Sequence, residues 1–279
     1  EGTVDMASAW GGAITVTQGK PWIAPVLTRP EDVYTLELPP PDAGTIGRSI
    51  ARWRALQARC DAPVAPQVPD MQGPLQVASM LWMRDDEFIL AMTDHPKEVH
   101  HLLDLVTRHI IQVIELFQAL DPQVGMSCWP PGWYGREMGC MIVEDFVQLL
   151  SPKLYVEYGL PYTSRIAERF GGVFIHCCAR CTQHWPAFRR IPNLRGLDTM
   201  YPFTKPEEVY ACFPGIVHSI GCDYAEMQRS FTGKGEDAWL EFLIARTPRD
   251  VRWRYVTGCD DPATVPRQLD IIERTWTRR

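Results

Sequence analysis

The 279-residue sequence contains no run of 18 or more apolar residues, so we expect no transmembrane helix. Its first residues, EGTVDMASAW, lack the positive stretch and apolar core of a secretory signal. Lys and Arg form no cluster, and a net charge of −6 argues against a nucleic-acid surface. Internal repeats and low-complexity tracts are also missing. These absences exclude nucleic acid and membrane as expected partners.

The sequence contains nine cysteines, an odd number that suits a framework of paired disulfides poorly. Two of them, Cys177 and Cys178, are adjacent. Thiols that stay reduced are typical of the cytoplasm, where they serve metal binding or packing. We therefore expect a cytoplasmic protein.

The composition, with 46% hydrophobic and 22% charged residues, is that of an ordinary globular protein. Single α/β barrels commonly occupy about 250 residues, so we expect one domain over residues 1–279. Residues 1–45 are expected to be irregular, because prolines recur there and break long elements. The central prediction of the fold therefore rests on the residues that follow.

Short apolar runs alternate with amphipathic helical segments over most of the chain, which predicts parallel β-α-β units. The expected strands are 62–69, 124–128, 173–178, 194–197, 215–220 and 253–256. The expected helices are 46–59, 96–120, 152–170, 185–191, 206–213, 237–245 and 262–276. No G-x-G-x-x-G turn follows a strand, so a closed (β/α)8 TIM-type barrel is favoured over an open dinucleotide-binding sheet.

Soft and anionic side chains collect where these strands end. His176 and Cys178 follow one strand, Asp198 the next, and Cys259 the last. In a barrel all these carboxyl ends face one rim, where active sites are built. We therefore expect these side chains to meet there.

His176 and Cys178 are two positions apart on an extended segment, so their side chains point the same way. With Cys259 from a distant strand they make a three-ligand layout, which for zinc is typical of a catalytic site with an open fourth position. Cys181 is a possible extra ligand. Cys178 and Cys181 also form a C-x-x-C, so a redox pair is the alternative.

Several segments together resemble the uroporphyrinogen decarboxylase superfamily. They are QGPLQVA at 72–78, DHPKEVHHLL at 94–103, LSPKLY at 150–155, FIHCC at 174–178 and GCDDP at 258–262. The resemblance runs from about residue 60 to the C-terminus and implies a (β/α)8 barrel. Family members usually begin with further elements, so the chain is expected to lack N-terminal parts of the barrel.

The superfamily includes cobalamin-dependent methyltransferases, such as those of the coenzyme M type, which carry a zinc motif H-x-C…C. His176, Cys178 and Cys259 match that motif residue by residue. The resemblance implies a zinc-dependent methyltransferase that moves a methyl group between a corrinoid and a small thiol. No D-x-H-x-x-G cobalamin signature is present, so the corrinoid would come on a separate protein. A monomer or homodimer is expected.

Further residues receive expected roles at the rim. Glu144 and Asp145 are candidates for acid–base work or substrate contact, and Asp198 for a further ligand or a partner that orients His176. Trp129, Trp133 and Tyr134 are candidates to line a pocket for a flat cofactor. Two alternatives remain: a metal-free decarboxylase of a uroporphyrinogen-like tetrapyrrole, and a non-catalytic barrel that binds zinc or a corrinoid.

Overall fold

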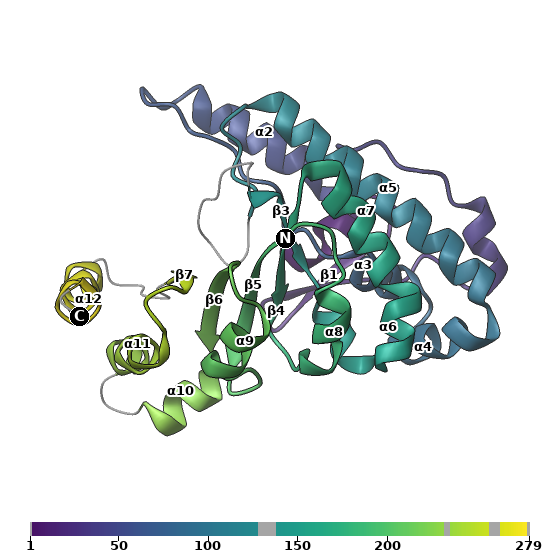
Figure 1. The fold of residues 1–279 in the computed structure, drawn as a ribbon. Helices are drawn as coiled ribbons and strands as arrows, with labels where there is room; N and C mark the ends of the chain where they lie inside the picture. The colour runs from purple at the N-terminus through teal and green to yellow at the C-terminus, as the bar shows by residue number, and fades with distance from the viewer. Residues whose placement is uncertain (1, 128–137, 232–234, 257–262, 278–279) are drawn as a thin grey trace.

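A computed structural model of the chain describes residues 2–127, 138–231, 235–256 and 263–277. Five parallel strands form one sheet in the order of the chain (Figure 1). They are β3 (Cys140–Val143), β4 (Val173–Cys177), β5 (Leu194–Tyr201), β6 (Val217–Cys222) and β7 (Arg252–Arg254). Helices connect successive strands, as parallel pairing requires. The predicted α/β class is therefore confirmed.

The sheet continues past β3 through two extended segments. Gln67 forms a parallel bridge with Gly125, and Gln72 forms one with Val143. At the other edge, no hydrogen-bonded pairing within the described ranges joins β7 back to these segments. The arrangement is consistent with a TIM-like fold, and a closed barrel of eight strands stays a prediction.

After β3, helices alternate with the strands of the sheet. They are α6 (Pro152–Tyr158), α7 (Leu160–Phe170), α8 (Trp185–Phe188), α9 (Pro206–Cys212), α10 (Tyr224–Ser230), α11 (Gly235–Arg246) and α12 (Thr264–Ile272). Single turns occur at η4 (Asp145–Leu149) and η5 (Thr182–His184), and the π-helical turn η6 (Glu273–Thr277) extends α12. The predicted helix 152–170 is divided at Gly159, where a side chain would lie 2.4 Å from the ring of Tyr155.

Helix α5 (Pro96–Leu120) has the bounds that its periodicity predicts. Eleven of its residues are buried, at spacings of three and four, so one stripe faces the core. It lies beside α3 (Pro74–Leu81), α4 (Asp85–Asp94) and α7 (Figure 1). No helix of the described residues is long and apolar enough to cross a membrane.

The prediction of an irregular N-terminus was wrong. Strands β1 (Ile14–Thr17) and β2 (Lys20–Ile23) form an antiparallel hairpin, preceded by η1 (Gly2–Val4) and α1 (Asp5–Ser8) and followed by η2 (Pro30–Thr35) and α2 (Thr45–Gln57). Gln18 and Gly19 both have positive φ, as a two-residue hairpin turn demands. Pro21 is tolerated because a short edge strand needs no donor there. Prolines exclude long elements, and these elements are short.

Two strand predictions also failed. Residues 62–69 form no strand beyond a bridge at Gln67, and residues 124–127 contribute the bridge at Gly125 and a hydrogen bond from Met141 of β3 to the carbonyl of Met126. Strand β3, which was not predicted, lies between these segments and β4. It is a run of only four apolar residues, all buried, too short for a periodic signal.

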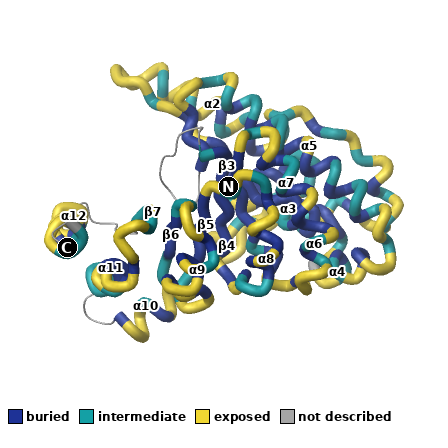
Figure 2. Tube along the Cα trace, in the orientation of Figure 1, coloured by how far each residue is buried: buried dark blue, intermediate teal, exposed yellow. Residues whose placement is uncertain are grey.

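Most buried side chains belong to one cluster that surrounds β3, β4 and β5 (Figure 2). All residues of β3 and β4 are buried. A second, small cluster of Leu240, Ile244 and Ile271 lies between α11 and α12. The strand ends at the centre of the sheet therefore stand on the most densely covered part of the molecule.

Candidate metal centre

The register of the central strands brings His176, Asp198 and Asp145, all candidates from the sequence, together at the carboxyl edge. Val143 of β3 pairs with His176 of β4, and His176 pairs with Asp198 of β5. The backbone N–H of Glu144 donates to the carbonyl of His176 at 2.8 Å, which holds the start of the next loop against β4. Asp145, one residue further, is thereby placed beside His176.

Asp145, His176 and Cys178 each offer one ligand atom, and these atoms lie within 4.8 Å of one another. The Nε2 atom of His176 lies 3.9 Å from Oδ1 of Asp145. That same oxygen accepts a 2.7 Å hydrogen bond from the backbone N–H of Cys178. His176 is buried and Cys178 is exposed, so the group opens to solvent on one side. Within the described residues no other such group occurs.

Asp198 holds the opposite side of the imidazole. Its Oδ2 lies 3.1 Å from Nδ1 of His176, and both side chains are buried. Burial by itself lowers the pKa of His176, but the hydrogen bonds with Asp198 and Cys178 and the charge of both aspartates raise it to about 10. A carboxylate on one ring nitrogen that leaves the other free is the usual support of a metal-bound histidine. The geometry favours Asp198 as the residue that orients His176.

The donor set fits zinc. Imidazole, thiolate and carboxylate are all zinc ligands, whereas a thiolate is a poor ligand for calcium or magnesium. Cys259, the third ligand of the predicted set, lies outside the described residues, as do Trp129, Trp133 and Tyr134. Asp145 was not predicted as a ligand. Its position two residues after a strand that pairs with β4 would have been the signal, but that strand was not recognised.

Glu144 differs from the expectation of a rim residue. Its side chain is fully buried, and Oε1 accepts a 2.5 Å hydrogen bond from Thr163 of α7. Burial raises its pKa to about 7, assisted by the charge of Asp145 and opposed by the bond from Thr163. Glu144 therefore faces the helical layer, and only Asp145 of the two faces the open edge.

Cys181 and Asp70 complete the surroundings. Cys181 is buried and stands outside the group of three ligand atoms, so the extra-ligand prediction finds no support in its position. Asp70, which the sequence did not single out, is buried and accepts a 2.7 Å hydrogen bond from Gln72. Burial raises the pKa of Asp70, while the nearby His176 lowers it. The edge is thus rich in carboxylates around one histidine.

Fold and edge together define an α/β protein with a parallel sheet, consistent with a TIM-like fold, and with a candidate metal centre at the carboxyl edge of that sheet. A solved structure with a similar fold is that of a methyltransferase from Methanosarcina mazei, with a TM-score of 0.70 and 12% sequence identity. The match covers 97% of this chain and 77% of that one. At this identity the likeness shows the fold. No family model and no curated protein matches the sequence.

Proposed function

We propose that the chain is a zinc-dependent methyltransferase that moves a methyl group between a corrinoid and a thiol. The convergence of Asp145, His176 and Cys178 at the carboxyl edge carries the proposal. The H-x-C…C motif of the sequence and the similar fold of a methyltransferase support it.

His176 through Nε2, Cys178 and Cys259 would hold the zinc, with the Asp145 carboxylate beside them. Bound zinc would keep a coordinated substrate thiol in its thiolate form, which is the nucleophile toward a methyl group. Asp198 fixes the ring of His176 at 3.1 Å, so Nε2 needs no reorientation. Asp145 is fixed in turn by the backbone N–H of Cys178.

Access to this centre comes from the side of Cys178, which is the exposed member of the group. A small thiol would enter there. The corrinoid, carried by a separate protein, would have to approach the same edge for its methyl group to reach the sulfur. Superfamily membership, both partners and a cytoplasmic location belong to this proposal.

The test is elemental analysis of purified protein combined with a transfer assay. Wild type should hold about one zinc per chain, Cys178→Ser and Cys259→Ser should lose most of it, and Cys60→Ser, at an exposed free cysteine, should keep it. Methylcobalamin with a panel of small thiols should yield methylated product only with the zinc-loaded forms. Full zinc occupancy in both ligand variants would refute the site.

The same experiment separates the rival functions. Zinc without methyl transfer to any thiol would favour the non-catalytic zinc-binding barrel. Protein free of zinc in all forms, with loss of carboxyl groups from a uroporphyrinogen-like tetrapyrrole, would favour the metal-free decarboxylase.

A further inference from the structure

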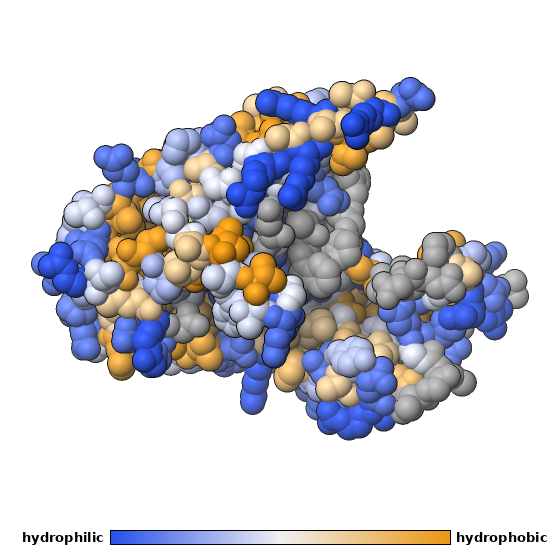
Figure 3. All heavy atoms as spheres, turned by 180° about the vertical axis from the view of Figure 1, so that it is seen from behind, coloured by the Kyte–Doolittle hydropathy of each residue, from blue (hydrophilic) through white to orange (hydrophobic). Residues whose placement is uncertain are grey.

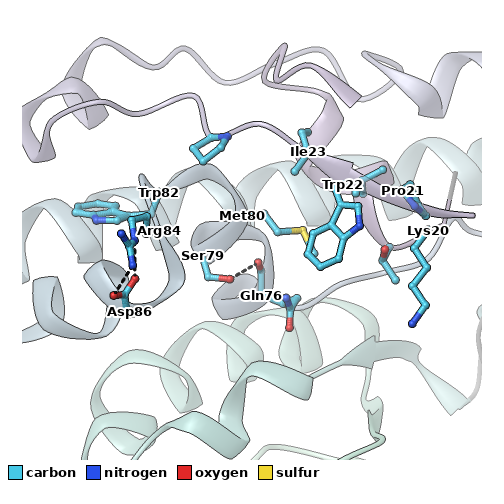
Figure 4. Close-up of a pocket in the computed structure, with 13 residues that line it drawn as sticks. Lys20, Pro21, Trp22, Ile23, Gln76, Ser79, Met80, Trp82, Arg84 and Asp86 are labelled. Carbon is cyan, nitrogen blue, oxygen red and sulfur yellow. Dashed lines mark hydrogen bonds and ion pairs between the residues drawn. The ribbon is translucent and has the colours of Figure 1, made fainter. Parts of the chain in front are cut away.

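A cavity lies away from the metal centre, between the N-terminal hairpin and helix α3 (Figure 4). Its volume is about 790 Å³, within the range of small-molecule sites, about 300–1,000 Å³. Residues of β2 form one wall, and residues of α3 and the turn after it form the other. None of the three candidate metal ligands lines it.

We infer that this cavity is a binding site for a small aromatic anion. The geometry that points to it is an apolar cleft with an uncovered indole in its middle and a cation at one end. The inference is independent of the proposed methyl transfer.

Trp22 supplies the aromatic surface. Its side chain is 60% exposed, which is unusual for the largest apolar residue type. Figure 4 shows the indole beside the thioether of Met80, with Gln76 below it. A flat ring placed on this indole would cover apolar area and gain stacking, which a flexible alkyl chain gains less well. The thioether is a soft neighbour that adapts to such a ring.

Lys20 supplies the charge. In Figure 4 it extends from the end of the cavity opposite Trp82 and Arg84. No carboxylate of the described residues lies within ion-pair distance of its ammonium group. Arg84, by contrast, is already paired with Asp86 at 3.0 Å. In a chain of net charge −6, the unpaired lysine makes this end locally attractive to an anion.

Trp82 lines the cavity at the end opposite Lys20 and is itself 1% exposed, so it closes that end with apolar surface (Figure 4). A flat aromatic acid therefore meets a cation and an indole face along the cavity.

Calorimetric titration with 2-naphthoate tests the inference, with neutral 2-naphthamide and aliphatic decanoate as comparison ligands. Naphthoate should bind more tightly than either. Trp22→Ala should weaken naphthoate about five- to ten-fold. Lys20→Gln should weaken naphthoate about three-fold and leave naphthamide unchanged, because an exposed charge pair contributes little. Tyr224→Ala, at a 78% exposed aromatic outside the cavity, should change nothing.

Naphthoate could instead reach a bound zinc ion through its carboxylate, so Cys178→Ser must be titrated as well. Unchanged affinity in Cys178→Ser, together with unchanged zinc content in Trp22→Ala, assigns the ligand to the hairpin cavity. Loss of binding in Cys178→Ser but not in Trp22→Ala would overturn the inference. So would an absence of binding accompanied by a dimer that Trp22→Ala dissociates, since the cleft would then receive a second copy of the chain.

Discussion

The region around β3, β4 and β5 and the region of β7, α11 and α12 are built differently. The first lies inside the large apolar cluster, and every residue of β4 is buried. The second has a small cluster of three buried residues, and β7 is a short edge strand with one exposed and two half-buried residues. Viewed from behind, the C-terminal helices are mostly hydrophilic, whereas the main body shows apolar patches (Figure 3).

This difference bears on how a metal site would be assembled. His176 and Asp198 stand on neighbouring buried strands, so their contact exists before any ion binds. Cys259 follows β7 in the sequence, and β7 is the edge strand beside the smaller cluster. We expect the region around β3, β4 and β5 to hold its metal donors in place before an ion binds. A bound metal should therefore add stability mainly to the region of β7, α11 and α12. Binding to the folded state only would stabilise it by mass action.

The largest expected effect comes from a substitution that creates a cavity in the region around β3, β4 and β5. Phe174 of β4 is fully buried and its ring lies against Gly196 of β5, where a side chain would approach within 2.3 Å. Phe174→Ala should lower the free energy of unfolding by about 3–5 kcal/mol, because the site cannot collapse around the lost ring. Urea unfolding followed by circular dichroism measures this. Phe203→Ala, at a 44% exposed ring, is the control and should cost well under about 1 kcal/mol.

A loss below about 1 kcal/mol for Phe174→Ala would contradict the tight packing of the region around β3, β4 and β5. An unchanged slope against urea in both variants is needed, because a changed slope would indicate a different unfolded state.

The second effect is a pH dependence at helix α5, whose apolar face belongs to the large cluster. His109 of α5 is buried with its ring 4.7 Å from that of Trp10, and burial lowers its pKa to about 4. Between pH 6.5 and 4 the unfolded chain therefore binds a proton that the folded chain does not. Stability falls as the pH falls through this window, by about 2 kcal/mol at pH 5 relative to pH 7.

His109→Gln removes this titration while keeping a polar side chain of similar reach. The drop in unfolding free energy between pH 7 and pH 5 should be smaller in the variant by about that 2 kcal/mol. Equal drops in both proteins would mean that folding does not lower the pKa of His109. Comparing differences in each protein removes the cost of the substitution itself.

The sequence predicted what depends on local pattern. Helix α5 repeats apolar residues with a helical period from Pro96 onward, so both of its ends were predicted correctly. Strands β4 and β5 followed from short apolar runs that stop at polar residues, although β5 continues past its predicted end at 197 to Tyr201. These features need no knowledge of which strand lies beside which.

Features that depend on pairing were not predicted. β3 is four residues long, and without it the register that brings Asp145 to His176 was invisible. The rim role of Glu144 rested on the resemblance around residues 150–155, which does not specify that its carboxylate turns to Thr163. The hairpin β1–β2 was hidden by its proline, although two positive φ angles make its turn. Side-chain direction after a strand is decided by neighbours far along the chain.

The third effect tests preorganisation. Asp198→Asn keeps the shape but removes the charge that holds Nδ1 of His176. Zinc affinity should fall about 10- to 100-fold, as for other residues that support a metal-bound histidine. Competition with a fluorescent chelator at pH 7 measures it. Asp250→Asn, at an exposed position, serves as the control. Unchanged zinc affinity in Asp198→Asn would show that the ring is held by other contacts.

The smallest effect uses one chemical change in both regions. Ile142 of β3 and Ile271 of α12 are both buried, at 0% and 4% exposure, but they belong to different clusters. Each change to valine removes one methylene and should cost about 1 kcal/mol. If the small cluster opens on its own, Ile142→Val should accelerate amide exchange in β4, which opens by global unfolding, about five-fold and leave α11 and α12 unchanged. Ile271→Val removes a contact that is lost in the local and in the global opening, so it should accelerate exchange in α11, α12 and β4 by the same factor. Acceleration of α11 and α12 together with β4 in Ile142→Val would mean that the two regions unfold as one unit, because a single cooperative transition transmits any local loss to every amide.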